Sequence, residues 1–319
     1  INYTNLYTEF MDINYFNNNS IDNFDQIGYP KKYMSAHYLT INLTKKINIS
    51  LFESVIWRVN HAPGTRGFDI NYLNPVLFLR PVEFSMNSPD NVLVGVNVKY
   101  IFSKDTYLYN QIILDEFSLN DLRKKDGFWG NKYGYQIGCK KYNIFNITNL
   151  TGQIEYNYVR PYTYAHNNPL QNYAHYNQPL AHPLGANFSE WLFLSSYRFL
   201  RWELEGKIIF AKYGGSISND LTSYGNNLYM STGNFGESEG IQNVGLGRPS
   251  DFNIYMYQGN LSELSYKELN LSYLINPKTN LKLTIGIVLR DFKDEEIQQQ
   301  TKIFNFGFKS DLFNNYYDF

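Results

Sequence analysis

The sequence predicts an all-β protein, and within that class a transmembrane antiparallel β-barrel with short periplasmic turns and long extracellular loops. Three observations favour this fold. Aromatic residues make up 18% of the chain, yet the mean hydropathy is −0.41, because Tyr and Phe occur beside abundant Asn. Alternating segments of about ten residues recur, which is the length of a tilted membrane-spanning strand. Tight turns alternate with long irregular loops, a segregation that a soluble sandwich has no physical reason to show.

The alternation predicts five hairpins and one further strand. The predicted strands are 33–44 with 47–58, 91–103 with 106–118, 131–143 with 150–161, 190–199 with 201–213, 263–275 with 280–292, and 301–313. In the last strand Phe304, Phe306 and Phe308 share one face, which is either the core side of a sandwich or the lipid side of a barrel. The predicted long loops are 59–90, 119–130, 162–189 and 214–262. The final residue, Phe319, follows an aromatic-rich strand, as in many outer-membrane barrels.

Composition excludes several classes of protein. The formal net charge of −1 gives no basic footprint for nucleic acid, so no nucleic-acid partner is expected. The single cysteine, Cys139, excludes an internal disulfide framework and a Cys-rich zinc site. No window holds about 18 consecutive apolar residues, which excludes a transmembrane helix. The start "INYTNLYTEF" lacks signal-peptide features and a leading Met, so we expect a mature or truncated chain.

The segment "YTYAHNNPLQNYAHYNQPLAHPLGANF" (162–188) holds three of the five histidines. Their spacing does not match helical metal sites, and the segment has no Cys or Asp, so no metal is predicted, although loops can gather distant ligands. Two interpretations remain: the prolines, His and Asn help to fold the loop, or the aromatic side chains contact a ligand or partner. Trp129, in "GFWGNKYG", either caps its loop or stacks on a ligand. The candidate contact residues are Trp129, Tyr162, Tyr164, His166, Tyr173, His175, Tyr176 and His182.

Acidic and basic residues near strand ends suggest ion pairs across a barrel lumen. The candidates are Glu53, Arg58, Arg80, Glu83, Asp115, Glu116 and Arg160. The alternative is a glycosidase that uses Asp115 or Glu116 with Glu83, but the sequence does not show the required carboxyl separation. Gly245 and Gly247 lack the spacing and flanking elements of a nucleotide-binding loop, so no cofactor is predicted.

Six motifs occur in a recognisable order in the middle of the chain. They are "LNPVLFLRPVEF" (73–84), "SPDNVLVGVNVKY" (88–100), "LYNQIILDEF" (108–117), "GFWGNKYGYQIG" (127–138), "YNYVRPYTYAHN" (156–167) and "NYAHYNQPLAHPLGANF" (172–188). This succession resembles the RemB-type gliding-motility outer-membrane proteins of Bacteroidota and, more distantly, the Wzi capsule-assembly barrel family. The resemblance covers residues 47–215 best.

The resemblance implies a single outer-membrane barrel over residues 1–319 with a role at the cell surface. The partners that it implies are outer-membrane lipid, surface polysaccharide, and the gliding or type IX secretion apparatus or other outer-membrane proteins. Barrels of this family have more strands than the roughly twelve that the alternation gives here. Either N-terminal strands are missing or the pattern misses several.

Three functions follow from these observations. The leading hypothesis is a non-enzymatic outer-membrane barrel whose long loops bind polysaccharide or a protein partner. The second is a β-rich carbohydrate-active enzyme. The third is a porin or transporter whose lumen carries the function. The path of the 162–189 loop separates the first from the third, because a loop folded into the lumen would plug it.

Overall fold

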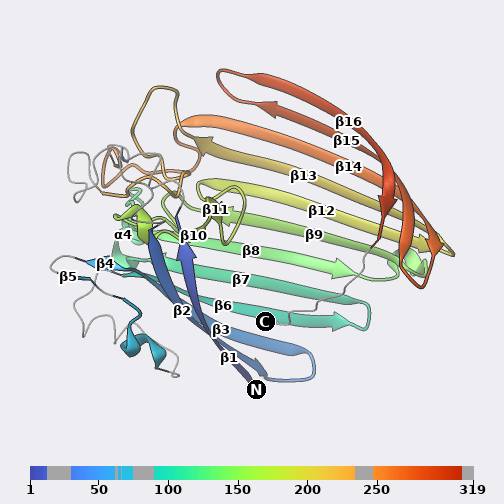
Figure 1. The fold of residues 1–319 in the computed structure, drawn as a ribbon, viewed down its shortest axis with the longest axis horizontal. Coiled ribbons are helices and arrows are strands. Elements are labelled where there is room, and N and C mark those ends of the chain that lie inside the picture. The colour runs from blue at the N-terminus through green and yellow to red at the C-terminus, as the bar shows by residue number, and fades with distance from the viewer. Residues whose placement is uncertain (13–29, 62–63, 66, 75–89, 234–246, 311–319) are drawn as a thin grey trace.

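The computed structural model describes residues 1–319 except 13–29, 62–63, 66, 75–89, 234–246 and 311–319 (Figure 1). Within the described residues, twelve strands form one antiparallel sheet, in which each strand pairs with the one before it along the chain. They are β1 (Asn2–Met11), β2 (Lys31–Asn42), β3 (Ile47–Arg58), β6 (Asn91–Ser103), β7 (Thr106–Glu116), β8 (Lys132–Lys141), β9 (Leu150–Val159), β12 (Phe188–Phe199), β13 (Trp202–Gly215), β14 (Asn260–Asn276), β15 (Leu281–Lys293) and β16 (Gln298–Lys309). The predicted all-β class is confirmed.

All eleven predicted strands are present, two with the predicted bounds and the others with bounds that differ by a few residues. The end of the predicted strand 301–313, from residue 311, lies outside the described residues. The prediction missed β1, because the apolar residues of its sequence "NYTNLYTEFM" do not alternate with a period of two. The remaining elements are short and lie in the connections. They are β4 (Asn60–His61), β5 (Gly64–Thr65), η1 (Ile70–Leu73), α4 (Leu119–Lys124), η2 (Ile144–Asn146), η3 (Pro169–Gln171), β10 (Ala174–His175) and β11 (Gln178–Pro179). No helix among the described residues is long and apolar enough to cross a membrane.

The predicted segregation of turns and loops is confirmed. Two to eight residues connect the strands at one end of the sheet, as in 104–105 and 142–149. Asn143, Asn149 and Asn280 supply positive-φ backbone in these turns. The other end, at the left of Figure 1, carries the long connections, and only the 294–297 turn there is short. We call these the turn end and the loop end.

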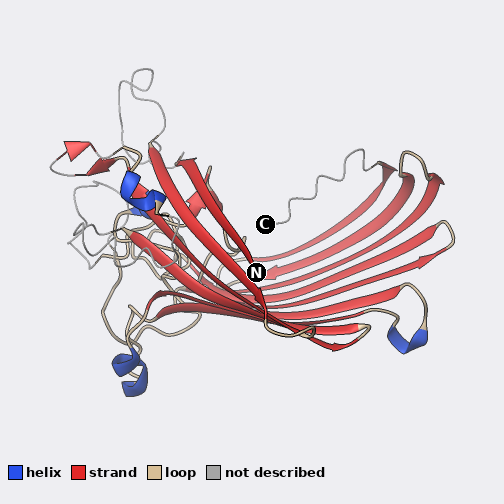
Figure 2. Cartoon of the chain, turned by 90° about the horizontal axis from the view of Figure 1, so that it is seen from below, coloured by secondary structure: helices blue, strands red, loops and turns tan. Residues whose placement is uncertain are grey.

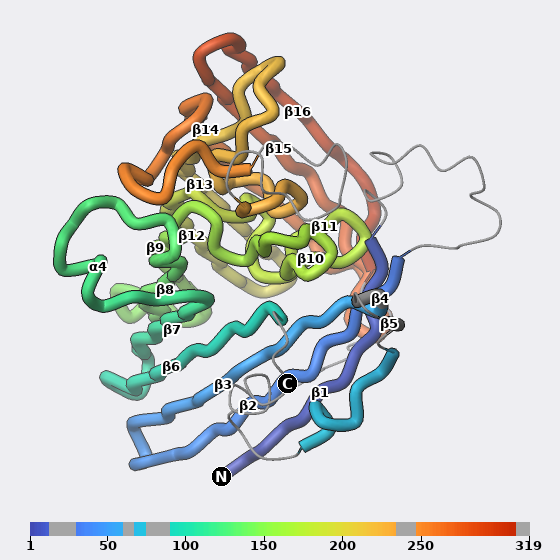
Figure 3. Tube along the Cα trace, turned by 90° about the vertical axis from the view of Figure 1, so that its left-hand side faces the viewer, coloured from blue at the N-terminus to red at the C-terminus, as the bar shows by residue number. Residues whose placement is uncertain are grey.

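The sheet is strongly curved, and β10 and β11 lie on its concave side (Figures 2 and 3). We call the concave side the inner face and the opposite side the outer face. The register assigns residues to each: Leu283, Ile285 and Ile287 pair directly with Phe308, Phe306 and Phe304 on the outer face. The inner face is polar, with Gln136 opposite Asn157 and Lys207 opposite Glu268. In the described sheet, β1 and β16 are the two edges.

The buried hydrophobic clusters lie at the loop end, on both faces of the sheet. On the inner face Leu93, Ile113, Val159 and Phe188 pack against residues of the connection between β9 and β12. On the outer face Val55, Trp57 and Val92 pack against Tyr72 of η1. The loops therefore fold back onto the sheet.

Candidate functional site

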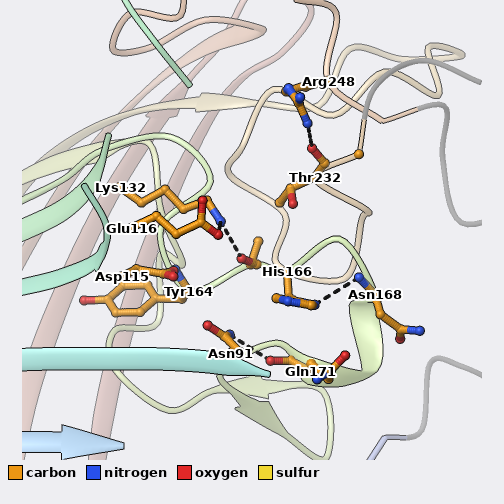
Figure 4. A network of polar contacts seen from close by, with 12 residues as sticks. Asn91, Asp115, Glu116, Lys132, Tyr164, His166, Asn168, Gln171, Thr232 and Arg248 are labelled. Carbon is orange, nitrogen blue, oxygen red and sulfur yellow. Dashed lines mark hydrogen bonds and ion pairs between the residues drawn. The ribbon is translucent and has the colours of Figure 1, made fainter. Parts of the chain in front are cut away.

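The connection between β9 and β12, residues 160–187, covers the inner face at the loop end, and we call it the plug loop. Its backbone is anchored by strand side chains from across the sheet (Figure 4). The Asp115 carboxylate of β7 accepts the Tyr164 N–H at 2.8 Å. The Lys32 ammonium of β2 donates to the Asn172 carbonyl at 2.6 Å, and the Asn91 amide donates to the Gln171 carbonyl at 2.8 Å. Lys32 and Asn91 are both buried, so these bonds are shielded from water.

Local sequence explains how the plug loop turns so tightly. Tyr162 and Tyr164 have φ values of 67° and 72°, a strained conformation for aromatic residues. Packing compensates for this strain: Tyr162 is 1% exposed, and its hydroxyl donates to the Ser223 carbonyl at 2.6 Å. Tyr164 stacks on Tyr173, with ring centroids 5.9 Å apart. Burial raises the pKa of Tyr162 and Tyr164, so both phenols are neutral.

The three histidines of the plug loop satisfy backbone groups at three separate places. His166 Nδ1 accepts the Asn168 N–H at 3.1 Å, and His182 Nδ1 accepts the Leu184 N–H at 3.2 Å. His175 Nδ1 accepts the N–H of Met11, at the end of β1, at 3.1 Å. Each imidazole is therefore the neutral Nε2–H tautomer when it makes this bond. His182 uses that proton to bond Glu190 Oε2 at 3.0 Å, and its ring lies on Phe188.

The environment of His166 disfavours its charged form. Burial lowers its pKa to about 4, and the charge of the nearby Lys132 acts in the same direction. Burial also lowers the pKa of His175. The described residues contain no group of three or more His, Cys, Asp or Glu side chains arranged to hold a metal ion.

The predicted contact residues occupy different surroundings. Trp129 is partly buried, with the Arg248 guanidinium 3.7 Å and the Lys132 ammonium 4.9 Å from its ring centre. A ring covered by these cations caps its loop rather than presenting a free face. Tyr176 is different: it is 46% exposed at the tip of the β10–β11 hairpin, with positive φ, and its N–H donates to the Met11 carbonyl. Among the loop tyrosines predicted as contacts, Tyr176 offers the most open surface.

A cavity of about 190 Å³ lies between the plug loop and the inner face. Tyr164, Tyr173 and His182 line it from the loop, and Gln111, Gln136 and Phe52 line it from the strands. Aromatic walls with a few amide groups are typical of small-molecule sites. Three of the predicted contact residues are thus brought together here.

The prediction of lumen ion pairs holds only in part. Glu116 pairs with Lys132 at 3.0 Å. Arg160 Nη2 donates to the Ile254 carbonyl at 3.1 Å, so this side chain binds the backbone of the connection between β13 and β14. Arg58 ends β3, close enough to His166 for its charge to act there. Arg80 and Glu83 lie outside the described residues, as does Phe319.

The assignment of Glu53 to the lumen is wrong. Glu53 alternates with Phe52 and Ser54, which line the inner cavity, so it points to the outer face. Its carboxylate accepts a bond from Nδ1 of His37, directly opposite on β2, at 3.1 Å. Both residues are almost completely buried. The predicted catalytic pairing of Asp115 or Glu116 with Glu83 involves a residue that lies outside the described part of the chain.

Asn187 was not predicted as a site residue, yet it joins the end of the plug loop to the end of β13 and to two parts of the connection between β13 and β14. It is fully buried, with a φ of 57°. Its side-chain nitrogen lies 3.0–3.1 Å from the carbonyl oxygens of Gly214, Tyr224 and Gln258, and its oxygen accepts the Tyr257 N–H at 2.7 Å. An Asn in a strand-to-loop junction gives no sequence signal of such contacts, because all of its partners lie 27 or more positions away along the chain.

No family model and no curated protein matches the chain. Among solved structures, a chain from work described as "Unveiling the Mechanism Behind the in-meso Crystallization of Membrane Proteins" is 8% identical, with a TM-score of 0.25. The match covers 95% of this chain and 81% of that one. A likeness at this level carries no argument about fold or function.

Proposed function

We propose that the chain forms a non-enzymatic outer-membrane β-barrel with a plugged lumen and a role at the cell surface. One observation carries the proposal: the outer face is apolar and exposed, whereas the inner face is polar. Phe304, Phe306 and Phe308 are 64–72% exposed, and the neighbouring Ile285 and Ile287 are 42% and 44% exposed. A sheet of a soluble protein buries its apolar face, whereas a membrane barrel turns that face to lipid.

The placement of aromatic residues supports the same proposal. At the loop end, outer-face rings of β8, β9 and β12 form a continuous row of contacts. Tyr135 stacks on Tyr158 at 5.0 Å, and Tyr156 contacts Trp191 at 4.7 Å. At the turn end Trp202 contacts Tyr273 at 4.8 Å. Two aromatic girdles that flank an aliphatic band are the pattern expected at the two membrane interfaces.

The plug loop supports a binding or anchoring role over conduction. Its buried polar bonds to β2, β6 and β7 hold it against the inner face at the loop end. Two of the three acids proposed for catalysis have structural partners, since Asp115 accepts the Tyr164 N–H and Glu116 pairs with Lys132. Surface polysaccharide is a suitable ligand, because the cavity combines flat aromatic rings with amide groups. A protein partner such as the gliding apparatus stays a proposal on the sequence resemblance alone.

The first test is extraction with and without detergent, followed by gel migration of heated and unheated samples. A barrel is expected to need detergent and to migrate faster unheated than heated. A soluble monomer without a heat shift would overturn the proposal.

The second test is conductance in planar bilayers. A plugged barrel is expected to show no regular channel steps. Regular, open-channel conductance from folded, heat-modifiable protein would favour the porin hypothesis instead.

A further inference from the structure

We infer that the outer face of β13–β16 binds a phosphorylated glycolipid of the surrounding membrane leaflet at Lys267 and Lys302. The inference rests on the proposed membrane barrel, because it needs that face to meet lipid. It adds a ligand class and a site outside the plug loop and its cavity.

The strand register shows a sharp change of chemistry along this face. Three successive rungs at the turn end are apolar: Gly206, Leu269, Ile287 and Phe304; then Leu204, Leu271, Ile285 and Phe306; then Trp202, Tyr273, Leu283 and Phe308. The next rung toward the loop end is Ile208, Lys267, Leu289 and Lys302. Rungs are about 7 Å apart along a strand, so this apolar band spans roughly 20 Å up to the lysines.

Lys267 and Lys302 flank Leu289 on that boundary rung, one strand away on each side. Adjacent strands lie about 4.8 Å apart, so the two lysine stems start about 10 Å apart and can converge on one phosphate. Both side chains are exposed. Lysines at the edge of an apolar band extend their ammonium groups toward the headgroup level.

A groove of about 480 Å³ begins next to this rung, on its loop-end side. Trp191 and Phe210 supply its aromatic part, and Lys212, Glu263, Asp291 and Gln300 are among its polar lining. Charged and amide groups beside exposed rings suit a sugar headgroup. The face thus offers three layers in order: an apolar band for acyl chains, two lysines for phosphate, and a polar groove for sugar.

Acidic residues near the site repel a phosphate from the loop-end side of the groove, which favours the boundary rung. Glu263 pairs with Lys212 at 3.3 Å and stands opposite Lys293. Asp294, Glu295 and Glu296 form the turn above Lys293 and make that level acidic. Asp291 is the acid on the rung next to Lys267 and Lys302. An anion is therefore favoured on the turn-end side of the groove, between Lys267 and Lys302.

The test measures binding of diphosphoryl lipid A to the detergent-purified protein by native mass spectrometry. The variant is Lys267→Gln with Lys302→Gln. Its matched control is Lys207→Gln with Lys309→Gln, which removes the same charge from the inner face of β13 and β16. We expect the outer pair to weaken binding roughly tenfold or more, and the inner pair to change it less than about twofold. The Lys267→Arg, Lys302→Arg variant should retain binding.

Equal losses in the outer and inner pairs, or no loss in the outer pair, would overturn the inference. Heat-modifiable migration of each variant establishes that it is folded. If wild-type protein is itself soluble and shows no heat shift, the membrane barrel fails and this site fails with it. If wild type is a barrel but the outer lysines do not matter, only the lipid site fails.

Discussion

The first strands of the sheet, β1–β3, and the last strands, β14–β16, show the same alternation but differ in what covers them. At the β1–β3 end, polar outer-face residues are buried: His37 and Glu53 are 1% and 2% exposed, and Ser35 donates to the Tyr72 carbonyl of η1 at 2.9 Å. Tyr7 likewise donates to the carbonyl of Leu73. At the β14–β16 end the outer face is apolar and open, with Ile285, Phe304 and Phe306 exposed.

The inner face shows the same difference. The plug loop contacts β1 through His175 and β2 through Asn172. On β16 the inner-face residues Ile303, Asn305 and Lys309 are exposed. Alternation therefore specifies the strands, whereas the long connections decide which faces become protein interior. A buried hydrogen bond between His37 and Glu53 on one half and exposed phenylalanines on the other are consequences of that choice.

The largest expected effect is in the covered strands β1–β3. Glu53→Ala removes the acceptor of His37 Nδ1 in a nearly water-free site and is expected to destabilise the fold by about 3–5 kcal/mol. Glu53→Gln keeps the volume and the acceptor oxygen and should cost much less. Urea unfolding in detergent, followed by tryptophan fluorescence, measures both. Glu205→Ala, at an exposed inner-face position, is the control and should change stability by no more than about 0.5 kcal/mol.

The next effect concerns strands β14–β16, whose outer face is exposed. Ile285→Arg places a charge on the middle rung of the exposed apolar band and should cost about 2–4 kcal/mol in a bilayer. Asn305→Arg places the same charge on the inner face of β16 and should cost little. The folded fraction in lipid vesicles, from heat-modifiable migration, reports the difference. Equal tolerance of both variants would show that this face does not meet lipid.

A third effect concerns acid and the plug loop that covers the N-terminal strands. Because the pKa of His166 is lowered from 6.5 to about 4, the unfolded chain binds a proton more readily than the folded chain. Its contribution to stability is therefore full above pH 6.5 and is lost as the pH falls toward about 4, by at most about 3 kcal/mol. Unfolding midpoints of wild type and His166→Gln at pH 7.5 and pH 5 measure this. The acid-induced loss should be smaller in the variant, and an identical loss in both would contradict the assignment.

Much of this comparison was predictable, because strand alternation needs only a period of two. The bounds of β3 and β6 were predicted to the residue, and the long loops fell at one end as expected. The same parity placed Glu53 on one face with Leu51 and Val55. The prediction nevertheless assigned Glu53 to a polar lumen, because its charge suggested water. The alternation of faces was the stronger physical constraint. A charged residue at an apolar-face position corresponds here to a buried contact between Glu53 and His37.

The site was less predictable than the fold. Sequence spacing argued against a helical metal site but could not show that His166 and His182 each accept an N–H from two residues further on. Those bonds depend on the path of a loop whose conformation is set by partners 30 or more positions away, such as Asp115 for Tyr164. Asn187 illustrates the same limit, since its four contacts come from three separate segments.

The smallest expected effect sharpens the comparison by setting an exposed ion pair on the outer face against the buried His37–Glu53 contact. Lys212 and Glu263 are 3.3 Å apart, much like His37 and Glu53, but their side chains are 41% and 56% exposed. Solvent and salt screen such a pair, and holding two long side chains in place costs entropy, so its coupling should be about 0.5 kcal/mol or less. A double-mutant cycle with Lys212→Ala and Glu263→Ala measures the coupling, and 0.5 M salt should remove most of it. A coupling above about 2 kcal/mol would mean that the groove beside this pair is less open to water than the β14–β16 end as a whole.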